Sequence, residues 1–236
     1  MIRVIINGAF GRMGQATQRA IQGAADCTCV ATLGRSDDLT AAIQQHTPDL
    51  VIDFTLPDAV YANTKIILDH KTKAVIGTSG LTAEQITDIE TQANANKIGV
   101  IIAPNFSISA ILMMRFAKAA APYFPKAEII EMHHDKKVDA PSGTAVKTAE
   151  MIQQTHATLA TSDNPARGAP FNNTHIHSVR LPGIFAKQDV IFGGIGETLT
   201  ISQHSMDRDS MMPGVLLACR KVMQQDRLIY GLEDVI

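Results

Sequence analysis

The sequence predicts an α/β protein, with a doubly wound parallel sheet in its N-terminal part and then an α+β part with a mixed or antiparallel open sheet. Two features carry this prediction. Short apolar, β-branched segments alternate with longer helix-compatible segments as far as Pro104, which is the pattern of β-α units around a parallel sheet. From His175 onward, apolar and polar residues alternate between glycines, which is typical of strands with one exposed face.

The strands expected in the N-terminal part are apolar throughout, so we predict that they are buried on both faces. They cover residues 4–6, 28–33, 50–54, 73–76 and 98–102. The crossover helices expected between them cover residues 13–23, 39–46, 57–70 and 82–96. Pro57 is predicted to lie in the first turn of its helix, and Thr82 to cap the next one. In such a Rossmann-type sheet, ligands bind beyond the carboxyl ends of the strands.

The second part is expected to differ from the first. The elements predicted there are a helix at 108–120, a strand at 127–133, a helix that opens near Ser142, a long exposed loop at 155–173 and successive antiparallel strands within 175–202. A last helix at 208–225 is expected to return to the first part. These boundaries predict one domain at residues 1–106 and 208–236, with a second domain at 107–207 inserted into it.

The charge and the cysteine content exclude several classes of protein. Lys and Arg total 21 against 23 Asp and Glu, a formal charge of -2, so neither nucleic acid nor a membrane surface is predicted as a partner. The sequence shows no bilayer-spanning stretch and no signal peptide, so a cytoplasmic location is expected. The 3 cysteines include no C-x-x-C pair, so neither a disulfide framework nor a metal site is expected.

A glycine-rich loop follows the first expected strand. Gly8, Gly11 and Gly14 have the spacing G-x-x-G-x-x-G, and Phe10 stands where the usual G-x-G-x-x-G pattern has its second glycine. Glycines let backbone N–H groups at a helix N-terminus approach a pyrophosphate closely. The position of the loop, after the first strand of a β-α series, favours dinucleotide binding over a purely structural turn.

The end of the second strand bears on the choice of dinucleotide. The acid that normally binds the adenosine ribose is missing there, and Arg35 stands nearby. An arginine can pair with the 2′-phosphate of NADPH, which is therefore the preferred cofactor, although Arg35 could also be a solvated loop charge. Asp37 and Asp38 could still reach a ribose, so the use of NADH stays open.

Small, turn-forming residues end two further strands. They are Gly77-Thr78-Ser79-Gly80 and Ala103-Pro104-Asn105-Phe106. Small residues admit a flat nicotinamide ring, but glycine-rich loops also end strands for structural reasons alone, and both interpretations stay open.

The densest chemical signal lies in residues 131–145. Two histidines, His133 and His134, end an expected strand, and two lysines follow within a few residues. Beyond them, residues 141–144 lie at the mouth of a helix, where free N–H groups favour a carboxylate. This pattern predicts a site for an anionic small molecule with acid–base groups beside it. The alternative is one core and one surface histidine; a shared metal is not expected, because neighbouring strand residues point to opposite faces.

Four motifs together carry a family resemblance. They are G-A-F-G-R-M-G at the N-terminus, G-T-S-G-L-T, A-P-N-F-S and E-M-H-H-D-K-K-V-D-A-P-S-G-T-A. With them, the chain resembles the 4-hydroxy-tetrahydrodipicolinate reductase family, also called dihydrodipicolinate reductases, over nearly its whole length. The last motif is far more specific to that family than the glycine loop is.

The resemblance implies NAD(P)H-dependent reduction of 4-hydroxy-tetrahydrodipicolinate to tetrahydrodipicolinate with loss of water, in lysine and diaminopimelate biosynthesis. It implies His133 as a catalytic proton donor and acceptor and Lys137 as a catalytic proton donor, with Lys136 outside the pattern. The substrate-binding residues it implies are His134, Ser142, Gly143 and Thr144. The cofactor-binding residues it implies are Gly8, Ala9, Phe10, Gly11, Arg12, Met13, Arg35, Gly77, Thr78, Ser79, Ala103, Pro104, Asn105 and Phe106.

The resemblance also implies a division of labour between the domains. The first would bind the dinucleotide, and the second would bind the dicarboxylate substrate and assemble a homotetramer. Gly34 stands where many family members carry an acid, which disfavours tight binding of NADH.

Two other functions are compatible with the pattern. One is a related two-domain NAD(P)-dependent dehydrogenase that acts on an amino acid or an aldehyde, which would need its own site residues. The other is a non-catalytic dinucleotide sensor, which would not require His133 or Lys137.

Overall fold

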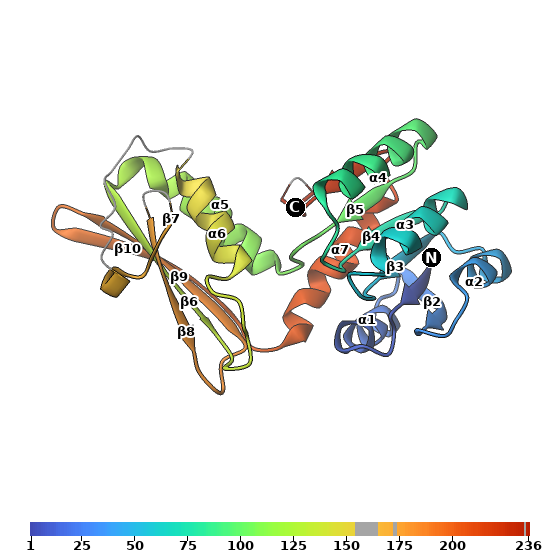
Figure 1. Cartoon of the computed structure of the whole chain (residues 1–236), viewed down its shortest axis with the longest axis horizontal. Helices are drawn as coiled ribbons and strands as arrows, with labels where there is room; N and C mark the ends of the chain where they lie inside the picture. Colours follow the sequence, from blue (N-terminus) through green and yellow to red (C-terminus); the bar gives the residue numbers. More distant parts are fainter. Residues whose placement is uncertain (154–164, 172–173, 234) are drawn as a thin grey trace. The chain divides into compact units, whose positions relative to one another are not determined.

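The computed structural model describes residues 1–153, 165–171, 174–233 and 235–236. It divides into two compact units: unit 1 comprises Met1–Phe106 and Met211–Ile236, and unit 2 comprises Ser107–Ser210. Figure 1 shows a helix-flanked sheet in unit 1 and long strands with helices in unit 2. The predicted fold class is confirmed, because the first sheet is wholly parallel and the second is mixed.

Unit 1 contains a 6-stranded sheet in the order β11-β5-β4-β3-β1-β2. Its strands are β1 (Ile2–Asn7), β2 (Cys27–Leu33), β3 (Leu50–Asp53), β4 (Lys73–Ile76), β5 (Val100–Ile102) and β11 (Leu228–Tyr230). Strands β3 and β5 are buried throughout, and β1 and β4 are buried except where they begin, as apolar strands between two helical layers should be. The prediction of burial on both faces is wrong for β2, in which only Cys27 and Leu33 are buried, because this strand lies at the edge of the sheet. Strand β11 was not predicted, because its three residues are too few to show a pattern.

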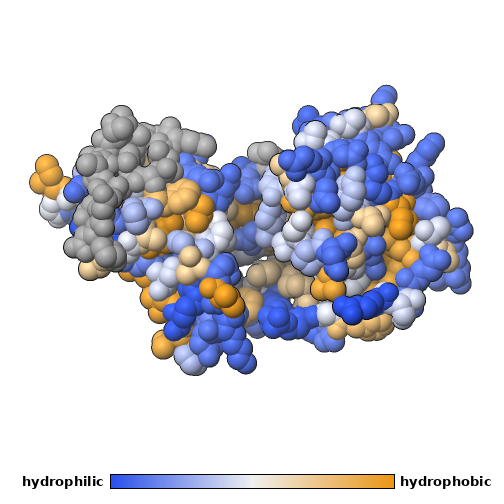
Figure 2. Space-filling model, viewed as in Figure 1, coloured by the Kyte–Doolittle hydropathy of each residue, from blue (hydrophilic) through white to orange (hydrophobic). Residues whose placement is uncertain are grey.

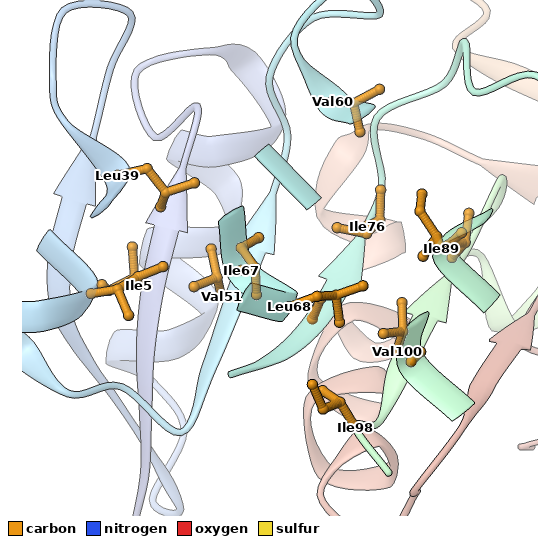
Figure 3. Close-up of a cluster of buried hydrophobic side chains, with 14 of the residues drawn as sticks. Ile5, Leu39, Val51, Val60, Ile67, Leu68, Ile76, Ile89, Ile98 and Val100 are labelled. Carbon is orange, nitrogen blue, oxygen red and sulfur yellow. The ribbon is translucent and has the colours of Figure 1, made fainter. Parts of the chain in front are cut away.

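Helices cover both faces of this sheet. They are α1 (Arg12–Gln22), α2 (Leu39–His46), α3 (Val60–Asp69), α4 (Ala83–Asn96) and α7 (Met212–Val222). Figure 3 shows the core between the sheet and α2, α3 and α4, with Ile5, Val51, Ile76 and Val100 from strands and Leu39, Val60, Ile67, Leu68 and Ile89 from helices. Burial of each such side chain contributes roughly 1.5–3 kcal/mol. The outer surface of α3 and α4 is mostly hydrophilic, as Figure 2 shows.

Two predicted helix starts have different outcomes. Thr82 caps α4 as predicted and forms a reciprocal capping box with Gln85. The prediction that Pro57 lies in the first turn of α3 is wrong, because α3 begins at Val60. The N–H groups of Ala59 and Val60 both donate to the carbonyl of Leu56, so a turn that contains Pro57 precedes the helix.

Unit 2 contains a 5-stranded sheet in the order β10-β9-β6-β8-β7. Its strands are β6 (Lys126–His133), β7 (Ala169–Phe171), β8 (Thr174–Arg180), β9 (Ala186–Gly194) and β10 (Glu197–Ser205). The prediction of successive antiparallel strands holds for β9 and β10 and is wrong for β8 and β9. Strand β6 lies between these two, parallel to β8 and antiparallel to β9.

The helices of unit 2 are α5 (Ile108–Ala120) and α6 (Gly143–Gln153). Most of the predicted loop at 155–173 lies outside the described residues; within it, a 3-10 helix (Pro165–Arg167) and β7 replace part of the expected loop. The helix expected at 208–225 is a 3-10 turn (Arg208–Met211) followed by α7. Among the described residues, no helix is long and apolar enough to cross a membrane.

Candidate active site

The loops predicted to hold the cofactor leave the same edge of the unit 1 sheet. The parallel register aligns the ends of β2, β1, β3, β4 and β5, with Asn7 beside Leu33 and Asp53, Asp53 beside Ile76, and Ile76 beside Ile102. The predicted cofactor residues at 8–13, 35, 77–79 and 103–106 follow four of these strand ends. The topology therefore gathers them at the carboxyl edge, where ligands of such sheets bind.

The glycine loop needs its glycines for backbone reasons. Gly8 has φ +78°, and a Cβ built on it would lie 2.3 Å from the carbonyl oxygen of Phe54. A Cβ on Gly14 would lie 2.3 Å from the carbonyl oxygen of Gly8. A side chain at either position would therefore overlap neighbouring backbone atoms, and the backbone of the loop would have to move.

The carbonyl groups of this loop already have partners. Gln18 Nε2 donates to the carbonyl of Ala9 (2.7 Å), and Gln15 Nε2 donates to that of Phe10 (3.0 Å). The helix α1 that follows has no side-chain cap at Gly11, and Arg12 and Met13 form its first turn. Three N–H groups of the loop are also engaged, since those of Gly8 and Ala9 donate to the carbonyl of Leu33 and that of Gly11 donates to the carbonyl of Gly8. N–H groups in the first turn of a helix lack intrahelical acceptors, so those of Arg12 and Met13 are the donors that this turn offers to an anion.

A buried carboxylate holds the loops at this edge together. Asp53, at the end of β3, is 0% exposed. Its Oδ2 accepts hydrogen bonds from the side-chain amides of Asn7 and Asn63, both at 3.0 Å. Its Oδ1 accepts from the N–H (3.0 Å) and hydroxyl (2.6 Å) of Thr55 and from the hydroxyl of Thr78 (2.7 Å). Asp53 therefore links the ends of β1, β3 and β4 with α3.

The hydroxyl of Thr78 in the loop at 77–79 is already engaged as a donor. Because the Thr78 hydroxyl donates to Asp53, it serves the sheet edge, and Ser79 is the exposed hydroxyl. Gly77 lies over two aromatic rings, and a Cβ built on it would meet those of Phe54 (2.1 Å) and Phe106 (2.8 Å).

The remaining predicted cofactor residues differ in exposure and charge. Ala103 and Phe106 are buried, and Pro104 is exposed. Arg12 and Arg35 are exposed cations near the ends of β1 and β2. No residue that the structure describes forms a hydrogen bond or ion pair with Arg35.

The acids near Arg35 are engaged by backbone groups. Asp37 Oδ2 accepts the N–H of Gly34 (2.7 Å), and Asp38 Oδ1 accepts the N–H of Ala41 (3.1 Å) as the cap of α2. A Cβ on Gly34 would lie 2.8 Å from the ring of Phe10, so that ring fills the space that a side chain at 34 would need.

Unit 2 carries the second buried carboxylate, at Glu131 on β6. Its side chain is 0% exposed. Oε2 lies 2.6 Å from His133 Nδ1 and accepts from Arg180 Nη1 (2.9 Å). Oε1 accepts from Arg180 Nη2 (2.7 Å) and from the N–H of Ser142 (3.2 Å). The parallel pairing of β6 with β8 sets His133 beside Arg180, so one carboxylate joins two strand ends to the start of α6.

Glu131 is ionised at neutral pH. Burial raises its pKa, but the hydrogen bonds with His133 and Arg180 outweigh burial and lower the pKa to about 2. The cluster therefore combines a carboxylate with a guanidinium and an imidazole.

Lys137 ends the turn that follows His134, since its N–H donates to the carbonyl of His134 (3.1 Å). Its Nζ lies 2.8 Å and 2.7 Å from the carboxylate oxygens of Asp139. The hydrogen bond from Lys137 lowers the pKa of Asp139, so the acid stays ionised beside the ammonium group. Arg180 also reaches this turn, because its Nη2 donates to the carbonyl of Asp139 (2.7 Å).

The predicted substrate-binding residues lie around the start of α6. Ser142 caps the helix through its hydroxyl, which accepts the N–H of Ala145 (3.3 Å). Gly143 and Thr144 begin the helix, and a Cβ on Gly143 would meet no atom within 4 Å. His134 Nδ1 is buried without a hydrogen-bond partner among the described residues, an arrangement that costs free energy unless a water or ligand supplies one.

Models of two protein families match the chain. The model described as dihydrodipicolinate reductase, N-terminus, matches residues 2–106, and that described as dihydrodipicolinate reductase, C-terminus, matches residues 109–236. This chain belongs to the dihydrodipicolinate reductase family. A 4-hydroxy-tetrahydrodipicolinate reductase of Coxiella burnetii (strain Dugway 5J108-111) is 52% identical over 239 residues, which cover 100% of this chain and 99% of the relative. One from Listeria monocytogenes serotype 4b (strain CLIP80459) is 45% identical over 262 residues, with both chains covered completely.

One solved structure agrees with the dihydrodipicolinate reductase assignment, and another shares the fold alone. The dipicolinate-bound dihydrodipicolinate reductase from Paenisporosarcina sp. TG-14 matches with a TM-score of 0.90 and 40% identity over 100% of both chains. A probable dehydrogenase from Thermotoga maritima matches with a TM-score of 0.69 and 11% identity over 99% of this chain and 92% of that one, which shows a shared fold.

The structure also singles out residues to which the sequence analysis gave no role. They are Asp53, Glu131, Asp139 and Arg180, each bonded to a predicted site residue or to the loop that carries one. An acid inside an apolar strand, as at Asp53, is the sequence signal that could have found the first of them. No group of three His, Cys, Asp or Glu side chains in the described part of this family member could hold a metal ion.

Proposed function

We propose that this chain is an NAD(P)H-dependent 4-hydroxy-tetrahydrodipicolinate reductase. It would convert that cyclic dicarboxylate to tetrahydrodipicolinate with loss of water, in lysine and diaminopimelate biosynthesis. The supporting observation is the cluster of His133, Lys137 and the open helix start at Gly143, in a chain that is 52% identical to a reductase of that name.

The substrate carries two carboxylates, and unit 2 offers donors for such groups. The start of α6 at Gly143 and Thr144 presents the positive end of a helix dipole to open space, so these residues bind one carboxylate. His134 Nδ1 gains a hydrogen-bond partner when the substrate is bound. Ser142 holds the helix start in shape through its cap.

His133 and Lys137 are the proton donors of this proposal. After the substrate ring has lost water, NAD(P)H when bound would supply a hydride to one carbon of the unsaturated ring, and the electron-rich, nitrogen-conjugated system that results would take a proton on the neighbouring carbon. His133, held by Glu131, and Lys137, held by Asp139, are both positioned groups that can carry that proton.

The carboxyl edge of unit 1 suits a dinucleotide. The first turn of α1, at Arg12 and Met13, offers N–H groups for the pyrophosphate, and the small residues at 77–79 and Ala103 would admit the nicotinamide. Exposed Arg35 favours NADPH through its 2′-phosphate, whereas Asp37 and Asp38 are already used by backbone N–H groups. NADH is then the weaker of the two cofactors.

The test is oxidation of NADPH, followed by loss of absorbance, with freshly generated 4-hydroxy-tetrahydrodipicolinate. Lys137→Ala should lower kcat on the order of 10²–10⁴-fold without loss of folding or nucleotide binding. Lys136→Ala is the matched control: this exposed neighbour lies outside the proposed site, and its loss should leave kcat unchanged. No NADPH consumption by the wild type, or equal activity of both variants, would refute the assignment and favour another dehydrogenase or a non-catalytic sensor.

We also propose that the protein is cytoplasmic and that it forms a homotetramer through unit 2. Among the described residues, α5 and α6 lie on one face of the unit 2 sheet, where Ile129 and Phe192 are fully buried. Ile130 and Ile191 point to the other face by strand alternation and stay partly exposed, so that face has apolar surface to bury. Sedimentation equilibrium should give four times the chain mass.

A further inference from the structure

We propose that Glu131 is a positioning residue that fixes the tautomer and orientation of His133. It would place the ring proton on Nδ1 and leave Nε2 as the nitrogen that exchanges a proton with the substrate. The inference deepens the proposed function and rests on the catalytic role given there to His133.

The groups around Glu131 show which atom carries the hydrogen between Glu131 Oε2 and His133 Nδ1. Oε2 faces His133 Nδ1 and Arg180 Nη1, and Oε1 faces Arg180 Nη2 and the N–H of Ser142, while the hydroxyl of Ser178 also donates to the carboxylate. The guanidinium and the backbone N–H are donors only. An ionised carboxylate is an acceptor only, so the hydrogen of the short contact with His133 belongs to Nδ1.

The ionisation of Glu131 is secured by its surroundings. Its pKa lies at about 2, because the hydrogen bonds with His133 and Arg180 outweigh the effect of burial. A neutral His133 therefore carries its hydrogen on Nδ1, and its Nε2 forms no hydrogen bond with any residue that the structure describes.

Several elements hold the pair in place. Arg180 comes from β8 and also donates to the carbonyls of Val179 and Asp139, and Ser142 comes from the start of α6. The positions beside Glu131 and His133 on β9 are the uncharged Gln188 and Ala186. The ring of His133 is thus oriented by a carboxylate whose own position is set by two strands and a helix.

Glu131→Gln tests the inference directly, because the NH₂ end of the glutamine amide is a donor and cannot accept a hydrogen bond. If the NH₂ group faced Ser142 and Arg180 Nη2, two donors would lose their acceptor. If it faces His133 instead, one Arg180 donor is lost and the NH₂ group can donate to Nδ1. The second arrangement is the less costly, and it moves the ring hydrogen of His133 from Nδ1 to Nε2.

The first measurement is the ¹⁵N spectrum of the His133 ring in the full-length, folded protein, assigned with His133→Gln. The wild type should show a protonated, pyrrole-type Nδ1 and an unprotonated Nε2 when the ring is neutral, and Glu131→Gln should show the reverse. A wild-type ring with its proton on Nε2 would overturn the inference without any variant. Glu131→Asp keeps an acceptor carboxylate and should retain the wild-type tautomer, so the test survives if the glutamine variant fails to fold.

The matched control is Glu128→Gln. Glu128 lies on the same strand, contacts Arg167 and His177 Nε2, and by alternation points to the opposite face of the sheet. It has the same kinds of partner as Glu131 but lies outside the proposed site. This variant should leave the His133 spectrum and kcat unchanged.

The kinetic measurement ties the tautomer to turnover. Glu131→Gln should lower kcat on the order of 10²-fold or more with little change in KM. His133 donates from Nε2 while Nδ1 keeps its own hydrogen, so the donor form carries hydrogen on both ring nitrogens, and an amide NH₂ group that faces Nδ1 opposes the hydrogen there. If His133→Ala retains kcat, the catalytic role of His133 fails while the spectra still report on Glu131. If His133→Ala loses kcat and Glu131→Gln inverts the tautomer without affecting kcat, the positioning inference fails while the proposed function stands.

Discussion

Asp53 in unit 1 and Glu131 in unit 2 are both fully buried carboxylates near the ends of parallel strands, yet they bind opposite kinds of partner. The donors to Asp53 are amides, hydroxyls and a backbone N–H, all uncharged. The donors to Glu131 include a guanidinium that binds both of its oxygens and an imidazole.

The difference reflects what each strand edge presents to a ligand. Asp53 holds loops that would contact a ligand through backbone N–H groups and glycines, so it determines the backbone conformation of those loops. Glu131 fastens side chains whose useful property is a proton or a charge, so it also sets the chemical state of a partner. Substitutions should therefore affect stability and nucleotide affinity at the first edge, and turnover at the second.

The largest contrast is expected between two glycines, one at each edge. Gly8→Ala should lower the free energy of unfolding by about 2–5 kcal/mol, because strain at φ +78° adds to overlap with Phe54. Gly143→Ala should change it by less than about 1 kcal/mol, because its Cβ enters open space. Urea unfolding followed by circular dichroism measures both, since the chain has no tryptophan.

Gly143→Ala should still affect the substrate. A methyl group in the open space before α6 should raise KM on the order of tenfold by weakening a charged hydrogen bond, and leave nucleotide affinity unchanged. Equal losses of stability in the two glycine variants would break the distinction between the edges.

Asp53→Asn should have the next largest effect. Both oxygens of Asp53 accept hydrogen bonds, so in either orientation the NH₂ group of an asparagine amide would face other hydrogen-bond donors. This should lower the free energy of unfolding by about 2–4 kcal/mol. NADPH affinity should fall because the loops at Gly8 and Thr78 loosen, whereas KM for the substrate should hold. Asp69→Asn is the control, since Asp69 is an exposed carboxylate of unit 1 that accepts from Gln92. A stable Asp53 variant with normal nucleotide affinity would contradict the role given to this residue.

Local patterns in the sequence predicted much of the fold. The strands of unit 1 and helices such as Leu39–His46 and Ile108–Ala120 follow from apolar runs and caps that act within a few residues. Strand β6 between β8 and β9 could not be predicted this way, because strand order depends on contacts between segments far apart in the chain. The same holds for β11, a short segment that becomes a strand only beside β5.

The candidate site divides in the same manner. His133, Lys137 and Gly143 lie within one short segment, so a motif can single them out. Arg180 is 49 residues from Glu131 in the chain and meets it only because β8 pairs with β6. Its part in the cluster therefore comes from the sheet, and no spacing within the sequence could have predicted it.

Arg35→Ala tests the charged side chain that we assign to the 2′-phosphate of the cofactor. If Arg35 pairs with the 2′-phosphate, kcat/KM for NADPH should fall by a factor that corresponds to about 1–3 kcal/mol of lost transition-state stabilisation. The value of kcat/KM for NADH should stay nearly unchanged and serves as the internal control. Arg35→Lys keeps the charge without the planar fork and should lose less. Equal losses with both cofactors would show that Arg35 supports the loop, in line with a purely backbone-based edge.

The smallest effect is a pH dependence that belongs to Glu131. Its pKa is lowered from 4.5 to about 2 in the folded chain, so it contributes stability above its unfolded pKa and loses that contribution as the pH falls toward 2. Between pH 6 and pH 4 the loss should be about 1 kcal/mol in the free energy of unfolding. Glu131→Gln has no such proton to bind, so its stability should decline less over this range than that of the wild type. Parallel declines in urea unfolding at the two pH values would mean that the carboxylate gains nothing from Arg180 and His133, and the contrast with Asp53 would lose its electrostatic basis.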